Sequence, residues 1–112
     1  MDTLFPIHPG VFLKEDFLVP MGLSAYRLSK DSGIPQSRIS NIILGKRSIT
    51  AETALKLSAY FGTSARMWLN MQMDYDLRLA AMKNGIDLKT LPEFQIPVEE
   101  SPRNKKKSVK VE

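Results

Sequence analysis

The sequence predicts an all-α domain of five helices followed by an extended basic tail. Three features of the chain support this fold class. Apolar residues recur at helical spacing between residues 9 and 83. Residues that start and stop helices separate these periodic segments, chiefly Ser or Thr before a helix and Gly after it. No segment shows the convincing alternation of a β-strand.

The first predicted helix begins at His8-Pro9-Gly10, because proline is favoured in the first turn of a helix, and ends at Pro20 and Gly22. We interpret His8, the only histidine, as part of the turn that starts this helix. A catalytic triad or a histidine-based metal cluster would need partners that the sequence lacks. The spacing predicts four buried residues, namely Val11, Leu13, Phe17 and Leu18.

Residues 24–44 predict two short helices joined by a tight turn. Ser24 is a good cap for the first of them, on which Leu28 faces inward. Gly33 can adopt the left-handed conformation that ends this helix, and Pro35 fixes φ where the next one begins. The second helix has an apolar face made of Ile39, Ile42 and Ile43.

The other face of the second helix carries side chains that can hydrogen-bond base edges in a major groove. Asn and Gln can each pair twice with adenine and Arg twice with guanine, whereas Ser is a less selective reader. We therefore predict base contacts from Gln36, Ser37, Arg38, Ser40 and Asn41. For Ser40 and Asn41 the alternative is an ordinary solvated helix face.

Positive charge is concentrated in residues 24–50, which hold five basic residues and one acidic residue. The formal charge of the whole chain is +4. A basic patch of this kind is the electrostatic footprint of a DNA-binding face. We expect phosphate contacts from side chains and from free N–H groups at helix starts in this segment, namely Ser24, Arg27, Lys46, Arg47 and Thr50.

Two further helices complete the predicted domain. Thr50 caps the fourth helix, which Gly62 ends, and Ser64 caps the fifth, which runs to about Lys83. The inward residues of the fourth helix are Ala54, Leu57 and Phe61.

The fifth predicted helix is apolar on two sides, so both sides must be buried. We predict that one side packs on the core and the other on a second subunit; burial of both within one subunit is the alternative. The spacing does not rank the two stripes, one of which consists of Leu69, Met73 and Leu77. We assign the dimer interface to the other, made of Trp68, Met71, Tyr75, Leu79 and Met82.

Residues 1–94 therefore make up one predicted domain for DNA binding and dimerisation, and residues 95–112 predict a flexible basic tail. The tail contains the run Lys105-Lys106-Lys107. This run suits a solvated tail, a nonspecific DNA arm or a contact to an acidic partner, and its charge does not choose among these roles.

The composition argues against several other functions. The chain has no cysteine, which excludes disulfides and cysteine metal sites, and it has no Gly-rich phosphate loop. Asp74 and Asp76 stand two apart and therefore point away from each other on a helix. We expect no enzymatic activity, cofactor, metal or small-molecule substrate. No signal peptide or membrane span is evident, which predicts a soluble, cytoplasmic protein without membrane contact.

Small Ser29 and Gly33, followed by apolar Ile39, match the pattern of the helix-turn-helix in lambda-repressor-like (XRE) proteins. The flanking residues resemble those of the HigA-type antitoxins in three places, which are HPG at 8–10, GKRSITA at 45–51, and FGTS at 61–64 with Trp68-Leu69. The resemblance covers residues 5–83. It implies a lambda-repressor-like domain that binds double-stranded operator DNA as a homodimer.

The same resemblance implies a second activity. Antitoxins of this type neutralise a HigB-type toxin, which cleaves mRNA, and repress the operon that they share with it. The resemblance also implies that Gln36 and Ser37 stand at the leading base-reading positions of the helix-turn-helix. Residues 1–18 and the fifth helix are both candidates for the toxin-binding surface. A stand-alone XRE-family repressor without a toxin partner is the alternative, and the intact basic helix-turn-helix disfavours an adaptor that does not bind DNA.

Overall fold

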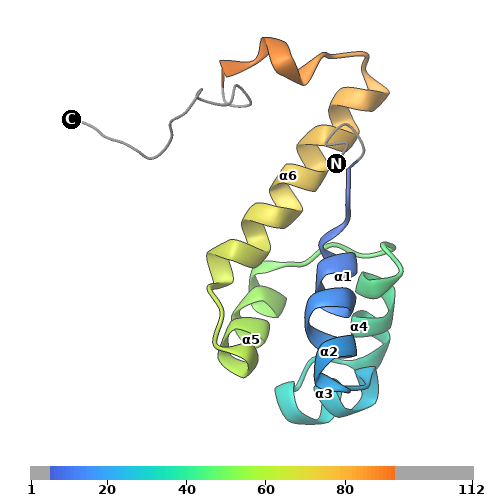
Figure 1. Ribbon diagram of the computed structural model, residues 1–112, viewed down its shortest axis with the longest axis vertical. Coiled ribbons are helices and arrows are strands. Elements are labelled where there is room, and N and C mark those ends of the chain that lie inside the picture. Colours follow the sequence, from blue (N-terminus) through green and yellow to red (C-terminus); the bar gives the residue numbers. More distant parts are fainter. Residues whose placement is uncertain (1–5, 93–112) are drawn as a thin grey trace, which may run out of the picture. The chain divides into compact units, whose positions relative to one another are not determined.

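The computed structural model describes residues 6–92, and all regular elements in this part of the chain are helical (Figure 1). The elements are α1 (Pro9–Phe12), η1 (Leu13–Leu18), α2 (Val19–Met21), α3 (Ala25–Ser32), α4 (Gln36–Ile43), α5 (Ala51–Phe61), α6 (Ala65–Lys83) and the short 3₁₀ turn η2 (Leu88–Thr90). The predicted all-α fold is confirmed: α1, η1 and α2 together form the first helix, and α3 to α6 are the other four. The predicted tail, residues 95–112, lies outside the described residues.

The first helix is continuous, but its middle section, η1, is a π-helix. Pro20 follows this section, and in a regular α-helix its ring would clash with the carbonyl group of Asp16, a clash that a wider turn relieves. In a π-helix the backbone hydrogen bonds join residues five positions apart, so residues with this spacing lie on the same face. Leu13 and Leu18 therefore both face the core. The prediction that Val11 is buried is wrong, because residues two apart on a helix do not share a face with each other.

The start of α1 packs directly on the backbone at the end of α4. A Cβ atom at Gly10 would overlap the carbonyl oxygen of Ile42 and would lie 3.0 Å from the Cα atom of Ile43. Glycine is therefore needed here because two helix backbones approach each other closely. This contact fixes the C-terminal half of α4 against the first helix.

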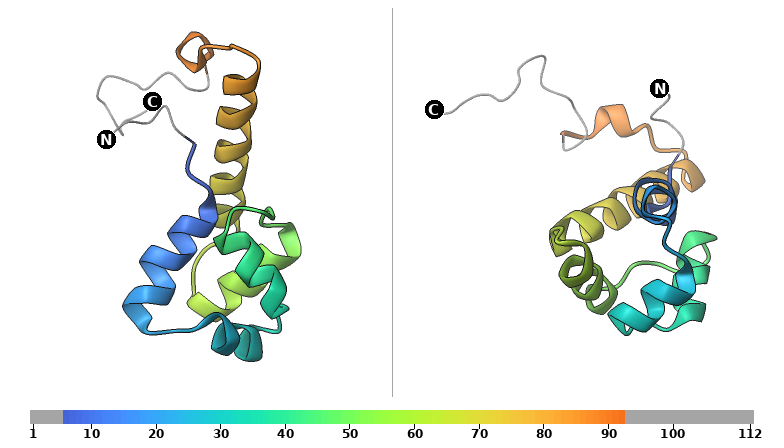
Figure 2. Two further views of the ribbon diagram at one scale, coloured as in Figure 1. Left: turned by 90° about the vertical axis from the view of Figure 1, so that its right-hand side faces the viewer. Right: turned by 60° about the horizontal axis from the view of Figure 1, so that its bottom comes forward.

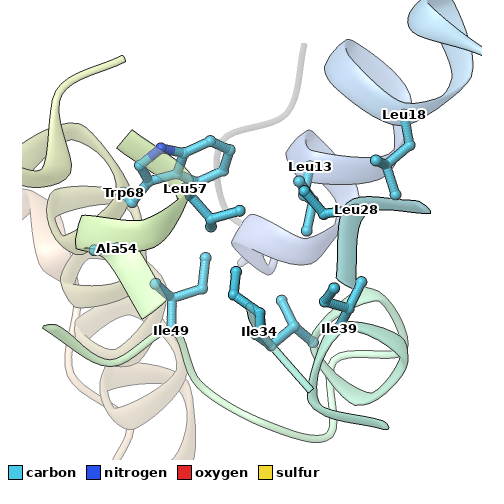
Figure 3. Packing of buried hydrophobic residues seen from close by; sticks show 10 residues of the cluster. Leu13, Leu18, Leu28, Ile34, Ile39, Ile49, Ala54, Leu57 and Trp68 are labelled. Atoms are coloured by element: carbon cyan, nitrogen blue, oxygen red, sulfur yellow. The ribbon is translucent and has the colours of Figure 1, made fainter. Parts of the chain in front are cut away.

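One hydrophobic cluster holds the five helices together (Figure 3). It is made of Leu13, Leu18, Leu28, Ile34, Ile39, Ile42, Ile49, Ala54, Leu57 and Trp68. The predicted inward positions of Leu28, Ala54 and Leu57 are confirmed. Ile34 and Ile49 come from the segments before and after α4, so the core anchors α4 at both of its ends.

Trp68 lies inside this core and is 0% exposed. Its indole Nε1 donates a hydrogen bond to Oγ1 of Thr63 at 2.7 Å, and its ring centroid lies 5.6 Å from that of Phe12 and 5.4 Å from that of Phe17. The prediction that Trp68 belongs to the dimer interface is therefore wrong. A side chain enclosed by its own subunit has no surface left for a second one.

The inward face of α6 continues from Trp68 through Gln72 to Tyr75, with spacings of four and three residues. Met73 is 56% exposed and Leu77 is 40% exposed, so the second apolar stripe is the outward one. Met71 is partly buried against the core. The remaining residues that we assigned to the interface differ in exposure: Tyr75 and Leu79 are half-buried and Met82 is exposed.

The chain divides into two compact units, residues 1–80 and 81–112. In the described part of the second unit, Asp87 caps η2 by accepting a hydrogen bond from the backbone N–H of Lys89 at 3.0 Å. Among residues 6–92, none of the helices combines the length and the apolar character that a membrane crossing requires.

Candidate nucleic-acid interface

The predicted helix-turn-helix is formed by α3 and α4, which lie side by side (Figure 2). Ser24 caps α3, because its Oγ accepts a hydrogen bond from the backbone N–H of Arg27 at 3.0 Å. Gly33 ends α3 with a φ of 83°, in the left-handed region that favours glycine. Ile34 is buried beneath the turn, and Pro35 stands at the start of α4. The local signals of residues 24–35 thus predicted the observed turn.

The helix α4 turns its isoleucines into the core, which leaves its opposite face outside. Ile39 and Ile42 are buried, whereas Gln36 and Ser37, the first two residues of α4, are exposed. Residues at the start of a recognition helix are the ones that reach base edges when the helix enters a major groove. The structure therefore leaves Gln36 and Ser37 free for this contact.

The second half of the outer face is less exposed. Ser40 and Asn41 are half-exposed, so either can reach a ligand or remain an ordinary helix surface. Leu44, directly after α4, is 65% exposed. The apolar pattern did not single it out, and an apolar side chain on this face can contact the methyl group of thymine.

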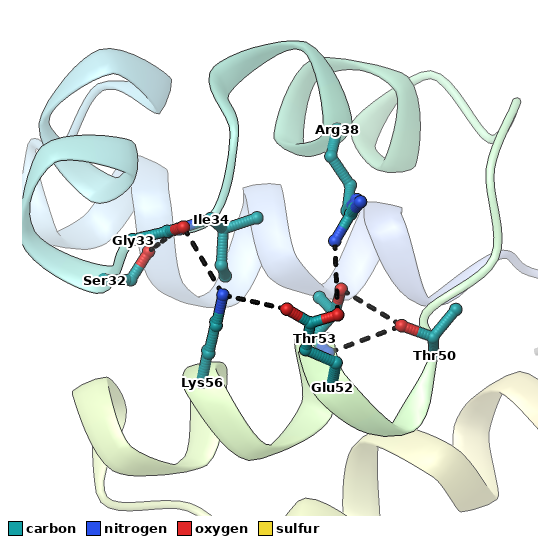
Figure 4. A network of polar contacts seen from close by, with 8 residues as sticks. All are labelled: Ser32, Gly33, Ile34, Arg38, Thr50, Glu52, Thr53 and Lys56. Carbon is teal, nitrogen blue, oxygen red and sulfur yellow. Dashed lines mark hydrogen bonds and ion pairs between the residues drawn. The ribbon is translucent and has the colours of Figure 1, made fainter.

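Arg38 points from α4 toward the first turn of α5 (Figure 4). Its Nη1 lies 4.0 Å from Oε1 of Glu52, and its buried Nε has no hydrogen-bond partner among residues 6–92. Glu52 also accepts a hydrogen bond from Nζ of Lys56 at 3.1 Å. That hydrogen bond and the positive charges of Lys56 and Arg38 hold the pKa of Glu52 below its usual value. The guanidinium group of Arg38 is thus turned toward α5, and the predicted base contact requires this side chain to move away from Glu52.

Arg27 is oriented by a carboxylate on its own helix. Its Nε donates to both carboxylate oxygens of Asp31, at 3.2 and 3.0 Å, while its side chain stays 68% exposed. Tyr60 of α5 donates a further hydrogen bond to Asp31 at 2.9 Å. The hydrogen bond from Tyr60, followed by that from Arg27, holds the pKa of Asp31 below its usual value, and the contact raises the pKa of Tyr60.

The segment 45–50 carries the other basic candidates between α4 and α5. Lys46 and Arg47 are exposed, and the backbone N–H of Lys46 donates to the carbonyl oxygen of Asn41 at 2.8 Å. At the end of the segment, Oγ1 of Thr50 accepts from the backbone N–H of Thr53 at 3.4 Å and so caps α5. All the base-reading candidates thus lie on α4, and the phosphate-binding candidates lie at the start of α3 and in the segment that follows α4.

The sequence interpretation missed Gln72, a polar residue on the buried face of α6. Its Oε1 accepts a hydrogen bond from the backbone N–H of Ile49 at 2.8 Å, which ties segment 45–50 to α6. One signal was available. Gln72 stands four residues after Trp68, so it shares the inward face on which apolar side chains are expected.

Three comparisons with known proteins agree with this geometry. A helix-turn-helix family model matches residues 13–68. Virulence-associated protein I of Dichelobacter nodosus is 54% identical over 74 residues, which are 66% of this chain and 68% of that protein.

Two solved structures are similar to the chain over most of their own length. An addiction module antidote protein of the HigA family from Coxiella burnetii aligns with a TM-score of 0.69 and 42% identity, covering 78% of this chain and 95% of that one. Pseudomonas aeruginosa antitoxin HigA, in a structure with the higBA promoter, aligns with a TM-score of 0.69 and 33% identity, covering 84% and 99%.

The matched region, residues 13–68, contains α3, α4 and segment 45–50, and therefore all the candidates for base and phosphate contacts. The predicted resemblance is thus confirmed. The chain belongs to the lambda-repressor-like (XRE) helix-turn-helix family, as a HigA-type antitoxin.

Proposed function

We propose that this DNA-binding antitoxin neutralises a HigB-type, mRNA-cleaving toxin by direct binding and represses its own operon as a homodimer. The observation that carries the DNA-binding part is the exposure of Gln36 and Ser37 at the start of α4, with exposed basic residues before and after that helix. Membership of the HigA type supports the toxin-binding part.

On DNA, α4 enters the major groove and α3 crosses the backbone, as in other helix-turn-helix proteins. Gln36, Ser37 and Arg38, with Ser40 and Asn41 deeper along the groove, read base edges. Arg27, Lys46 and Arg47 contact phosphates together with free N–H groups at the starts of α3 and α5, where Ser24 and Thr50 stand. Phosphate contacts supply affinity, and base contacts supply sequence preference.

The homodimer forms through the outward face of α6. On this face Leu69 is half-buried in the single chain, and Met73 and Leu77 are exposed. Dimerisation would remove these apolar side chains from water. A two-fold dimer presents two copies of α4 to a pseudo-palindromic operator. The centres of the two operator half-sites are then separated by one helical turn of DNA, which is ~34–36 Å, or by a multiple of that distance.

The toxin binds the first helix of the antitoxin. Exposed apolar side chains occur along this helix at Val11, Val19 and Met21, with 46%, 59% and 56% exposure. Removing apolar side chains from water favours association with a partner. The outward face of α6, the other candidate, is then occupied by the second subunit.

Co-expression of the chain with the small open reading frame next to its gene tests the antitoxin activity. The expected result is rescue of growth and a purified complex whose mass, by light scattering, exceeds that of the lone dimer. A lone dimer with a harmless neighbour would contradict toxin binding and leave a stand-alone XRE-family repressor.

A further inference from the structure

Segment 45–50, which carries Lys46 and Arg47, donates a backbone hydrogen bond to a buried side chain of α6. Gln72 is 5% exposed, and its Oε1 accepts a hydrogen bond from the backbone N–H of Ile49 at 2.8 Å. The other end of the same amide, Nε2, donates to Oδ1 of Asp76 at 3.0 Å. Both ends of the Gln72 side chain are therefore paired, which fixes the orientation of the amide.

A second tie reaches the same segment from the start of α1. Nδ1 of His8 accepts a hydrogen bond from the backbone N–H of Gly10 at 2.9 Å, so the ring proton belongs on Nε2. The imidazole lies beside segment 45–50, since a Cβ atom added at Gly45 would lie 3.8 Å from its Cγ atom, and it meets the ring of Tyr75 at a centroid distance of 4.9 Å. One buried polar side chain, Gln72, thus hydrogen-bonds the backbone of this segment, and a second, His8, packs beside its first residue.

We propose that Gln72 is a positioning residue for DNA binding, which places Lys46 and Arg47 at the phosphate backbone by fixing the N–H of Ile49. This inference rests on the proposed DNA-binding function. Lys46 and Arg47 have flexible side chains. The N–H of Lys46 donates to the carbonyl oxygen of Asn41 on α4, and the residues that follow, up to the start of α5, lie outside any helix. The placement of the two basic residues therefore depends on where both ends of segment 45–50 are held: α4 holds the first end, and α6 holds the other through Gln72.

The experiment measures binding of the full chain to a duplex of its own promoter over a range of salt concentrations. The variant Gln72→Leu keeps a similar side-chain size and removes the acceptor for Ile49. We expect the slope of log affinity against log salt to flatten by about 0.9 for each phosphate that the variant no longer neutralises, with affinity roughly tenfold lower at low salt. The control Thr63→Val removes the hydrogen bond to Trp68 and leaves segment 45–50 untouched, so its slope should stay at the wild-type value.

A second variant covers the case in which Gln72→Leu does not fold. Gln72→Glu combined with Asp76→Asn preserves net charge, keeps an acceptor for Ile49, and reverses the donor and acceptor between positions 72 and 76. The double variant should show the wild-type slope of log affinity against log salt. Gln72→Glu alone places two carboxylates next to each other at positions 72 and 76, and its slope should be flatter. In a Gln72→Leu, Lys46→Ala double variant, the two slope changes should be less than additive, since both substitutions weaken the same phosphate contact.

The outcomes separate this inference from the proposed function. No binding of the wild-type chain to promoter DNA at low salt would overturn the DNA-binding function itself. Wild-type binding with an unchanged slope in folded Gln72→Leu, or with no recovery in the charge-swapped pair, would overturn the positioning role of Gln72 alone.

Discussion

The hydroxyl group of Tyr60 on α5 donates a hydrogen bond to Oδ2 of Asp31 on α3 at 2.9 Å. Asp31 is the single acidic residue within residues 24–50, and it also accepts both hydrogen bonds from Nε of Arg27. One carboxylate thus joins two helices and orients a basic residue that we assign to phosphate binding. It also brings a negative charge to a face that must approach DNA.

The variant Asp31→Asn should bind DNA more tightly. The side-chain oxygen of asparagine can still accept from Tyr60, while one negative charge near the phosphates is removed. We expect roughly twofold to fivefold higher affinity for any duplex at low salt, and a smaller gain at high salt because exposed charges are screened. Fluorescence anisotropy with promoter and random duplexes measures this. Asp16→Asn is the control, since it changes the net charge equally outside residues 24–50; an equal gain in both variants would contradict a local role for Asp31.

Gly10→Ala should destabilise the fold even though alanine is the better helix former by about 1 kcal/mol. The added Cβ would overlap the carbonyl oxygen of Ile42, and the neighbouring atoms belong to the backbone of α4, which cannot rotate away. Overpacking of this kind costs about 1–3 kcal/mol. Urea unfolding followed by circular dichroism measures the decrease in stability, with exposed Val11→Ala as the control on the same helix. Unchanged stability in Gly10→Ala would show that the backbones of α1 and α4 lie farther apart than the structure places them.

Acidification should weaken the folded state through His8. Burial holds the pKa of His8 below its ordinary value, although its bond to the Arg47 backbone and the charge of Asp76 act in the opposite direction. Well above about pH 6.5 both the folded and the unfolded states keep this histidine neutral. As the pH falls, the unfolded state takes up the proton first, so stability declines until the pH passes the lowered pKa of the folded state.

The variant His8→Asn isolates this effect, because asparagine can still cap α1 but does not titrate. Thermal unfolding at about pH 7.5 and about pH 5.5 should show a larger decrease in Tm for the wild-type chain than for the variant. The carboxyl groups with lowered pKa values, Asp31 and Glu52, titrate below this window. The same pH dependence in both proteins would assign the effect to another group.

The homodimer should depend on the outward face of α6. Leu77→Glu places a charge in the apolar contact that we propose and should yield a monomer by light scattering at micromolar concentrations. Leu55→Glu is the matched control, since Leu55 is 63% exposed on α5 and lies outside the proposed interface. A dimer that persists in Leu77→Glu, or a monomer in both variants, would contradict the assignment.

Local signals were sufficient to predict most of the fold. Ser24, Thr50 and Ser64 accept hydrogen bonds at the helix starts where caps were predicted, and Gly33 and Gly62 end helices in the left-handed conformation. These residues act on backbone groups within a few positions along the chain. Their effect can therefore be read from the sequence without knowledge of the tertiary structure.

Contacts between distant segments could not be predicted in this way. The two stripes of α6 have similar spacing, so nothing local showed that Trp68 packs inward while Met73 and Leu77 face out. The hydrogen bond between Gln72 and Ile49 joins residues 23 positions apart. The approach of Arg38 to Glu52 likewise depends on where the first turn of α5 lies relative to α4, which periodicity alone does not specify.

The division of labour between base and phosphate contacts is tested most directly by titrating three proteins, the wild type, Gln36→Ala and Lys46→Ala, against promoter and random duplexes at several salt concentrations. Gln36→Ala should weaken binding by about 1–3 kcal/mol on the promoter alone and relax one operator position. Lys46→Ala should weaken binding to both duplexes alike and flatten the salt dependence by about 0.9 for each phosphate that is no longer neutralised. Equal decreases in affinity for promoter and random DNA in both variants would contradict the assignment of α4 as the helix that reads the operator.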